Sequence, residues 1–289
     1  MQSVLGWSAR MKWMAKIAAA VVLVSGCETI DPVQEGGYRV SEALRNQQPV
    51  PMLSPLYGKE LTIDRAYRIQ RLTQEQAFQG RTPAGFKGGL TNATAQQRYG
   101  ASGPVAGVLP PGALLKADEI DGYRVRLKDY RQPMVEVEVG FRVAQRITQT
   151  LPDVQTLQAY LGEIVPAVEL PDMQLASADV RAVDIIVANA YARHVITGLG
   201  RAPGLTDPNA VGVTLYRDGE VLNEGHGRDV SGDQWQALLW LVNRTIESGW
   251  TIEPGQVLIT GAMGKPVPMT AGIYVADFGR FGRLEWSVE

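Results

Sequence analysis

Hydrophobic positions recur along this chain with two spacings, one typical of helices and one typical of strands. Apolar residues three and four apart predict helices over 62–78 and 231–247, the first capped by Thr62 and the second by Ser231. Strict alternation over 134–143 predicts a strand. We also expect short helices at 40–47, 92–99 and 154–162 and strands at 164–170, 211–217, 220–223, 256–260, 273–278 and 284–288, with 183–195 left unassigned. The pattern predicts a mixed α/β domain.

Glycine and proline divide the chain into parts. Residues 28–60 hold Gly36-Gly37 and, further on, Pro49, Pro51 and Pro55, which predicts a tether with one short helix ahead of the main body. The apolar stretch 103–115 is so rich in both residues that we expect a loop closing over something. The predicted organisation is a leader over 1–26, a tether over 27–60 and a single domain over 61–289.

The first 27 residues have the layout of a secretion signal. Basic residues precede the uncharged run 17–26, which at about 1.5 Å per residue is too short to span a bilayer core of about 30 Å. The run ends in Val24-Ser25-Gly26-Cys27, which resembles the lipobox of bacterial lipoproteins. That resemblance implies cleavage before Cys27 and lipidation of Cys27. Glu28 after the cysteine then implies the outer membrane, with the protein facing the periplasm; Met1, Met11 and Met14 are alternative starts.

Composition excludes several classes of protein. With 289 residues, 45% of them hydrophobic, the chain is long enough for a packed core. Its formal net charge of -2 supplies no basic field for a nucleic acid, so we expect no such partner. One cysteine makes neither an intramolecular disulfide nor a cysteine-based metal site.

Three glutamates are candidates for a metal site. Glu136 and Glu138 share one face of the predicted strand 134–143, and Glu169 lies among apolar residues in another predicted strand. Three carboxylates without histidine or cysteine suit a hard cation such as Mg²⁺ or Mn²⁺. The alternative is that Glu136 and Glu138 form the solvated face of an amphipathic strand.

Seven segments together resemble one enzyme family. They are GFKGGLT at 85–91, Gln96-Gln97, VEVEV at 135–139, VPAVE ending at Glu169, Asp184 with Asn189, WLVN at 240–243 and ITGAMG at 259–264. In this order they resemble the 2-oxopent-4-enoate hydratases and 4-oxalocrotonate decarboxylases of the fumarylacetoacetate hydrolase superfamily. The resemblance implies a mixed α/β β-roll with flanking helices, a divalent cation on Glu136, Glu138 and Glu169, Lys87 near the substrate, and a homo-oligomer.

The resemblance also implies a reaction. A small 2-oxo acid chelates Mg²⁺, which stabilises the enolate formed when the neighbouring carbon gains or loses a proton or CO2. Lys87 then offsets substrate charge or transfers a proton, the alternative being an exposed lysine in a glycine-rich turn. Leu90, Thr260 and Gly261 are candidate substrate contacts, although Thr260 and Gly261 equally suit ordinary strand termination.

The two histidines and the departures from the family pattern limit the reactions that we expect. Relatives that hydrolyse carbon–carbon bonds use an early histidine, whereas the two here, His194 and His226, come late and are predicted to be structural. Val105 stands where relatives have an acidic residue, and the pattern also departs at Ala188-Asn189, Asp233-Gln234 and Gly272-Ile273. We therefore expect a membrane-anchored hydratase for a 2-hydroxy-dienoic acid such as 2-hydroxypenta-2,4-dienoate. The alternatives are a 2-oxo-3-enedioate decarboxylase and a non-catalytic envelope lipoprotein.

Overall fold

The computed structural model describes residues 31–115, 122–176 and 179–289, and residues 31–289 form one compact unit. The predicted leader and Cys27 lie outside the described residues. The tether was expected to reach residue 60, whereas the described residues from 31 onward lie within the compact unit. Helix α1 (Pro32–Arg45) begins at the Asp31 cap, and Val40, Val50 and Leu53 are buried, because the apolar side of this segment packs into the core.

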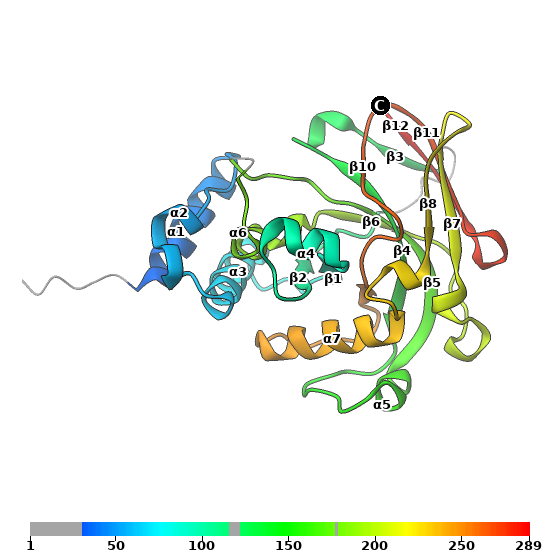
Figure 1. The fold of residues 1–289 in the computed structure, drawn as a ribbon, viewed down its shortest axis with the longest axis horizontal. Helices are drawn as coiled ribbons and strands as arrows, with labels where there is room; N and C mark the ends of the chain where they lie inside the picture. Colours follow the sequence, from blue (N-terminus) through cyan, green and yellow to red (C-terminus); the bar gives the residue numbers. More distant parts are fainter. Residues whose placement is uncertain (1–30, 116–121, 177–178) are drawn as a thin grey trace, which may run out of the picture. The chain divides into compact units, whose positions relative to one another are not determined.

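Two sheets organise the described part of the chain (Figure 1). The larger has the order β2-β1-β9-β4-β5-β6, with β10 added to β4, and the smaller has the order β3-β12-β11-β7-β8. The strands of the larger sheet are β1 (Gly85–Gly89), β2 (Val105–Leu109), β4 (Met134–Val143), β5 (Leu161–Leu170), β6 (His194–Thr197), β9 (Val257–Ile259) and β10 (Val267–Pro268). Those of the smaller are β3 (Tyr123–Val125), β7 (Gly212–Arg217), β8 (Glu220–His226), β11 (Gly272–Asp277) and β12 (Arg283–Val288). Strands β4 and β5 curve strongly along their length.

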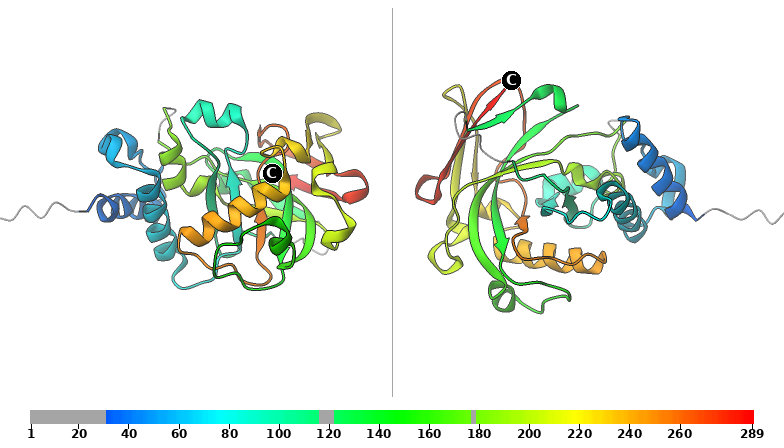
Figure 2. Two further views of the ribbon diagram at one scale, coloured as in Figure 1. Left: turned by 60° about the horizontal axis from the view of Figure 1, so that its bottom comes forward. Right: turned by 180° about the vertical axis from the view of Figure 1, so that it is seen from behind.

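The helices gather on the side of the larger sheet away from β7, β8, β11 and β12 (Figures 1 and 2). Besides α1 they are α2 (Ser54–Tyr57), α3 (Ile63–Phe78), α4 (Ala93–Tyr99), α5 (Val154–Gln158), α6 (Ala182–Val187) and α7 (Gln234–Glu247). Single 3-10 turns connect several elements, among them η3 (Asn189–Tyr191) between α6 and β6. No helix in the described ranges is both long and apolar enough to cross a bilayer.

Several predicted elements are confirmed where local chemistry decides them. The Thr62 hydroxyl accepts a hydrogen bond from the Arg65 N–H at 3.2 Å and begins α3. Asn92 caps α4 in the same way, through the Ala95 N–H at 2.9 Å. Asp218 and Gly219 have φ values of 50° and 85°, as the tight β7-β8 turn requires.

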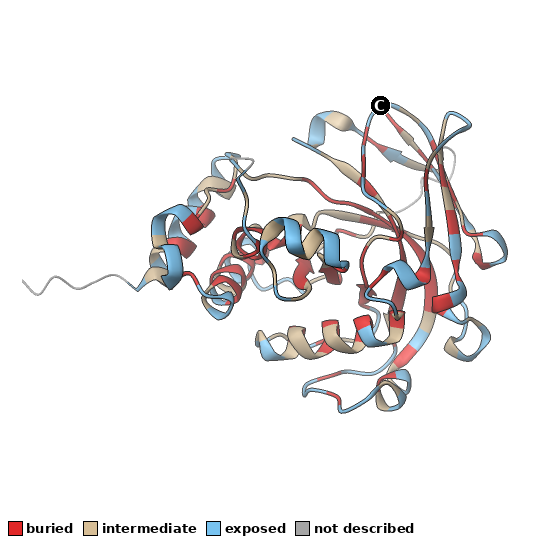
Figure 3. Ribbon diagram, in the orientation of Figure 1, coloured by how far each residue is buried: buried red, intermediate tan, exposed pale blue. Residues whose placement is uncertain are grey.

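Tertiary packing overrode other predictions. Helix α7 is capped by Asp233, not Ser231, because the Asp233 carboxylate accepts from the Gln236 N–H at 3.0 Å. The stretch 103–115, expected to be a loop, contains the fully buried strand β2. Its residues fit between prolines 104 and 110, and it pairs along its length with β1. Figure 3 shows buried residues concentrated on β4, β5 and the face of α7 that meets the sheet.

Candidate metal centre and active site

The register of β4 and β5 brings the three glutamates together. Glu136 pairs directly with Glu169, and Glu138 follows two residues later on the same face of β4. One carboxylate oxygen from each of the three lies within 4.8 Å of the others. The predicted convergence of two separate segments is therefore present in the fold.

Burial excludes a solvated face at this position. Glu138 and Glu169 are 0% exposed, and Glu136 is half-buried. The Gly261 N–H donates to Glu138 Oε2 at 2.6 Å. Glu138 Oε1 and Glu169 Oε1 have no hydrogen-bond partner among the described residues. Buried carboxylate oxygens are costly unless paired, so the site calls for a cation.

Lys87 provides one positive charge at the site. On β1 it pairs with Ile259, which in turn pairs with Gly140 of β4, and this register puts Lys87 on the same face as the glutamates. It is 4% exposed, with Nζ 2.9 Å from Glu169 Oε2 and 3.1 Å from the Ala190 carbonyl oxygen. Lys87 is thus a buried strand residue, and the alternative of an exposed lysine in a turn is wrong.

The electrostatics of the four groups agree with this crowding. Burial, followed by repulsion from Glu169 and Glu136, raises the pKa of Glu138 well above its ordinary value. Burial raises the pKa of Glu169 to about 7 although Lys87 opposes the shift. Burial of Lys87 alone would lower its pKa, but attraction by the carboxylates, Glu169 first, leaves the pKa of Lys87 raised.

The residues present fit a divalent cation. Three carboxylates face one ammonium group, which leaves two negative charges uncompensated when all four groups are ionised. Glu138 Oε1 and both oxygens of Glu169 accept no hydrogen bond from the described residues, Glu169 Oε2 being ion-paired with Lys87, and oxygen-only donors are those that Mg²⁺ and Mn²⁺ prefer. Glu136, Glu138 and Glu169 could hold such an ion.

The structure gives less support to the three predicted substrate contacts than to the metal site. The Thr260 hydroxyl donates to the Gln234 side chain and also lies 3.4 Å from the Val139 carbonyl oxygen. The Gly261 N–H serves Glu138. Leu90 is half-buried beyond the end of β1 with φ 53°. The polar groups of Thr260 and Gly261 are therefore engaged within the protein, and their proposed contact with a substrate carboxylate stays a prediction.

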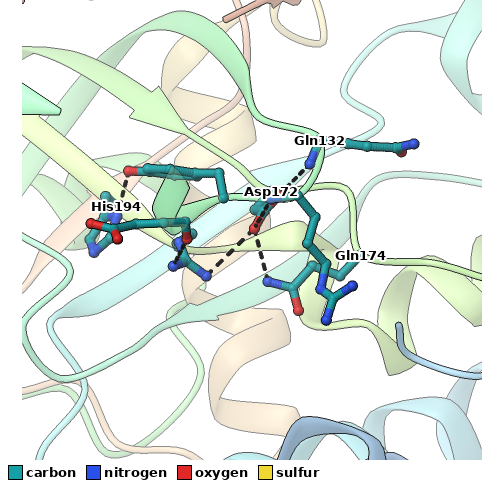
Figure 4. A network of polar contacts seen from close by, with 8 residues as sticks. Gln132, Asp172, Gln174 and His194 are labelled. Carbon is teal, nitrogen blue, oxygen red and sulfur yellow. Dashed lines mark hydrogen bonds and ion pairs between the residues drawn. The ribbon is translucent and has the colours of Figure 1, made fainter. Parts of the chain in front are cut away.

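A second polar network lies beside the site, at the end of β5 (Figure 4). The Asp172 carboxylate accepts from the backbone N–H groups of Arg131 and Gln132 at 2.9 and 2.8 Å and from Gln174 Nε2 at 3.1 Å. His194 Nδ1 lies 2.6 Å from the Tyr130 hydroxyl. Burial, and next the Arg193 charge, lowers the pKa of His194 to about 4.

The positions of His194 and His226 indicate structural roles for both. His194 pairs with Leu170, one residue from Glu169, so its side chain lies on the opposite face of the sheet from the glutamates. His226 is exposed and accepts from the Arg228 N–H at 3.3 Å. These placements agree with the structural roles predicted for both residues.

Two features beside the site have no specific signal in the sequence. The Ala190 carbonyl contacts Lys87 across 103 residues of chain. The position of a backbone oxygen cannot be predicted from residue type. The hydrophobic pattern assigns no element to the segment around Asn189, and this is the only indication in the sequence. The network of Asp172 was also missed, because a lone aspartate after a strand has no distinctive pattern.

Comparisons with known proteins show that the chain is similar to hydratases. No protein-family model matches it. It is 30% identical over 255 residues to a 2-keto-4-pentenoate hydratase from Burkholderia vietnamiensis, covering 85% of this chain and 93% of the relative. It is 28% identical over 259 residues to a 2-oxo-hept-4-ene-1,7-dioate hydratase from Escherichia coli, covering 85% and 94%.

Solved structures support the fold. A 4-oxalocrotonate decarboxylase from Pseudomonas putida G7, complexed with magnesium and adipate, superposes with a TM-score of 0.79 at 22% identity, covering 89% of this chain and 97% of that one. A fumarylpyruvate hydrolase from Pseudomonas aeruginosa, in complex with Mn²⁺ and pyruvate, gives a TM-score of 0.56 at 12% identity, covering 70% and 88%.

The fold is like that of proteins of the fumarylacetoacetate hydrolase family, and the buried carboxylate cluster is a candidate metal centre within it. The chain belongs to the family of the 2-keto-4-pentenoate hydratases, and it is an enzyme of the lyase class. The expected fold and enzyme class are both confirmed.

Proposed function

We propose that this protein is a divalent-metal-dependent hydratase acting on a small 2-hydroxy-dienoic or 2-oxo acid such as 2-hydroxypenta-2,4-dienoate. The observation that carries the proposal is the buried carboxylate cluster with unpartnered oxygen atoms, 2.9 Å from a buried lysine. Relatives named hydratases over most of the chain support the reaction type.

Glu136, Glu138 and Glu169 would hold the cation. When bound, Mg²⁺ or Mn²⁺ supplies Lewis-acid polarisation of the oxygen atoms of a 2-oxo acid. Glu138 is held in place for this role by the Gly261 N–H. Glu169 is held by Lys87, so the same ion pair connects the metal ligands to the lysine.

Lys87 acts in its protonated form. Because the carboxylates raise its pKa, Lys87 remains an ammonium group at neutral pH and donates hydrogen bonds or a proton. Lys87 donates one hydrogen bond to the Ala190 carbonyl and forms an ion pair with Glu169, which leaves an N–H available to a substrate oxygen.

The surroundings strengthen these interactions. A small apolar cluster packs around the same sheet; its buried members are Leu109, Ala113, Ala167, Val195, Val257 and Ile259. In the β4-β5-β6 register, Ala167 and Val195 share the face that carries Glu138 and Glu169. These apolar neighbours lower the local dielectric constant, and charges in a low-dielectric environment interact more strongly than in solvent.

Turnover tests the proposal directly. The purified protein with Mg²⁺ or Mn²⁺ should remove the ultraviolet absorbance of 2-hydroxypenta-2,4-dienoate, and Glu136→Ala should abolish this activity. Glu163→Gln is a matched control, because Glu163 lies on β5 but is half-exposed and paired with Arg142. Turnover that persists in Glu136→Ala, or none in the wild type, would contradict the proposal.

Decarboxylation of a 2-oxo-3-enedioate is the second candidate, and Val105 favours it. Its Cγ2 lies 3.3 Å from the position that a Cβ on Gly89 would occupy, and Lys87 Nζ lies 3.8 Å from the same point. An apolar side chain beside the lysine cannot activate water, whereas loss of CO2 requires one proton donor. Release of CO2 from 2-oxohex-3-enedioate, faster than hydration of the dienoate, would favour this candidate.

We further propose that the chain is lipid-anchored through Cys27, in the outer membrane and facing the periplasm. The support is sequence alone: basic residues, an apolar run and Val24-Ser25-Gly26-Cys27. Radiolabelled palmitate should label the wild type and leave Cys27→Ser unlabelled, and Cys27→Ser should leave the membrane fraction. Equal labelling of both proteins would sink the proposal.

A further inference from the structure

The backbone beside Lys87 has an unusual conformation. Asn189, Ala190 and Tyr191 have φ values of 56°, 47° and 61°, three consecutive non-glycine residues in the left-handed region. Each such residue costs roughly 1–2 kcal/mol relative to the right-handed conformation. Strain of this kind persists only where surrounding contacts impose it, and it gathers at functional sites.

The Asn189 side chain imposes this conformation. Its Oδ1 accepts from the Val108 N–H at 2.8 Å, and its Nδ2 donates to the Val108 carbonyl at 2.8 Å. Nδ2 also lies 3.3 Å from Gln74 Oε1. Val108 belongs to β2, the last strand of its sheet in the observed order, so the carboxamide satisfies both backbone groups as a neighbouring strand would.

Close packing leaves the turn little freedom. A Cβ on Gly107 would lie 2.7 Å from the Asn189 carbonyl oxygen and 3.1 Å from both Ala190 Cβ and Lys87 Cδ. On the other side, the Asp172 N–H donates to the Tyr191 carbonyl at 3.0 Å. The turn is therefore held between β2 and the end of β5.

The turn presents the Ala190 carbonyl to Lys87. This oxygen lies 3.1 Å from Nζ, and Glu169 Oε2 lies 2.9 Å from Nζ. An ammonium group has three N–H bonds in fixed tetrahedral directions. A hydrogen bond to Ala190 together with the ion pair to Glu169 therefore restricts the orientation of the ammonium group and of its remaining N–H bonds, which the Glu169 contact alone would not do.

We infer that Asn189 is a positioning residue, which aims an available N–H of Lys87 at an oxygen atom of the 2-oxo acid by holding the Ala190 carbonyl in a strained left-handed turn. This inference rests on the proposed function. It assigns the strain to orientation of the lysine, and it predicts that Asn189 matters for ligand recognition only while Lys87 is present.

A double-mutant cycle tests the inference with a readout other than turnover. The probe is oxalate, a planar dianion that resembles the enolate of a 2-oxo acid, titrated in the presence of Mg²⁺. Asn189→Gly removes the carboxamide while tolerating positive φ. We expect its oxalate affinity to fall about 10-fold, as is typical when a supporting partner is lost, and its kcat with the dienoate to fall as well. In a Lys87→Met background the same change should leave oxalate affinity within a factor of two.

Asn243→Ala is a matched control. The Asn243 carboxamide also binds both backbone groups of one residue, Leu151, at 2.7 and 2.9 Å, but it lies on α7. This variant should lower the melting temperature and leave oxalate affinity and kcat unchanged. Asn189→Asp, nearly isosteric, serves if Asn189→Gly does not fold, and should show the same dependence on Lys87.

Two results would overturn the inference. Equal losses of oxalate affinity with and without Lys87 would mean that Asn189 acts through general distortion of the site. Unchanged oxalate affinity in both Asn189 variants would mean that the turn does not orient the lysine. Failure of the wild type to turn over the dienoate, with the oxalate cycle intact, would instead remove the proposed substrate and leave the positioning role standing.

Discussion

Two buried carboxylate clusters lie close together at the end of the β4-β5 pair, and they differ in how completely they are paired. Asp172, 1% exposed, accepts from two backbone N–H groups and from Gln174, and Arg193 Nη1 lies 3.5 Å from it. Glu138 and Glu169, both 0% exposed, each retain an oxygen atom without a hydrogen bond among the described residues.

The difference separates a structural carboxylate from a ligand. A fully hydrogen-bonded buried carboxylate stabilises the fold by fixing the segments around it. An incompletely paired cluster destabilises the fold until a cation arrives, and it is retained for what the cation does. Burial alone does not distinguish the two cases, because the exposed fractions are nearly equal.

A substitution at the metal site should have the largest effect, on both activity and metal-dependent stability. Glu138→Gln should lower kcat/KM by more than about 100-fold, since loss of even an outer-shell partner costs up to that much. The rise in melting temperature caused by Mg²⁺, which corresponds to about 2.7 kcal/mol at 100 times Kd, should vanish. Thermal melts with and without Mg²⁺ measure this; an unchanged melting temperature in the wild type at millimolar Mg²⁺ would count against the site.

In the metal-free protein, replacing the acid by its amide should change the free energy of unfolding in opposite directions at Asp172 and Glu138. Asp172→Asn should lower the free energy of unfolding by about 2 kcal/mol, because donors that faced a carboxylate lose a charged acceptor. Glu138→Gln should raise it by about 1 kcal/mol, because a repelling buried charge is removed. Urea unfolding in metal-free buffer decides this, and destabilisation by both changes would erase the contrast.

A pH series sharpens the contrast further. The pKa of Glu169 is about 7 in the folded protein and near 4.5 when unfolded, so the folded state binds more protons between these values. The stability of the metal-free protein should therefore fall as pH rises from about 4.5 to about 7, by about 2 kcal/mol relative to Glu169→Gln. Saturating Mg²⁺ should suppress the fall, since the cation binds the ionised form. Parallel curves for wild type and Glu169→Gln would contradict the burial effect.

The smallest expected effect concerns one hydrogen bond of the paired cluster. Gln174→Ala removes the donor at 3.1 Å from Asp172 Oδ2 and should cost about 1 kcal/mol of stability. The Mg²⁺-dependent shift and the oxalate affinity should not change. A loss of metal binding in this variant would show that the two clusters are not independent.

Local chemistry made much of the fold predictable. Thr62 and Asn92 cap their helices as their side chains allow, and alternation over 134–143 placed Glu136 and Glu138 on one face. The motif segments supplied Glu169 and Lys87 as partners, although the spacing of the residues alone left a solvated face as an alternative.

Other features depended on packing that no short segment encodes. Residues 105–109 form a buried strand because β1 offers a partner, despite flanking prolines. Residues 32–60 belong to the core because their apolar side packs against α3 and α6. The Asp184 carboxylate also accepts hydrogen bonds from the N–H groups of Leu53 and Ser54 at 2.9 and 2.8 Å. The Asp184 contacts span 131 and 130 residues, and neither they nor the strand pairing leave a local period in the sequence.

By itself the sequence determined which residues carry charge, which strand faces they occupy and which family they belong to, because residue type and period two are local properties. The tertiary structure decided that Glu138 and Glu169 are buried without full pairing, and that the Ala190 carbonyl meets Lys87. Both facts depend on strand register and on a strained turn held from a distance by Asn189. Registers and strained turns are set by the sum of long-range contacts, which only the folded chain brings together.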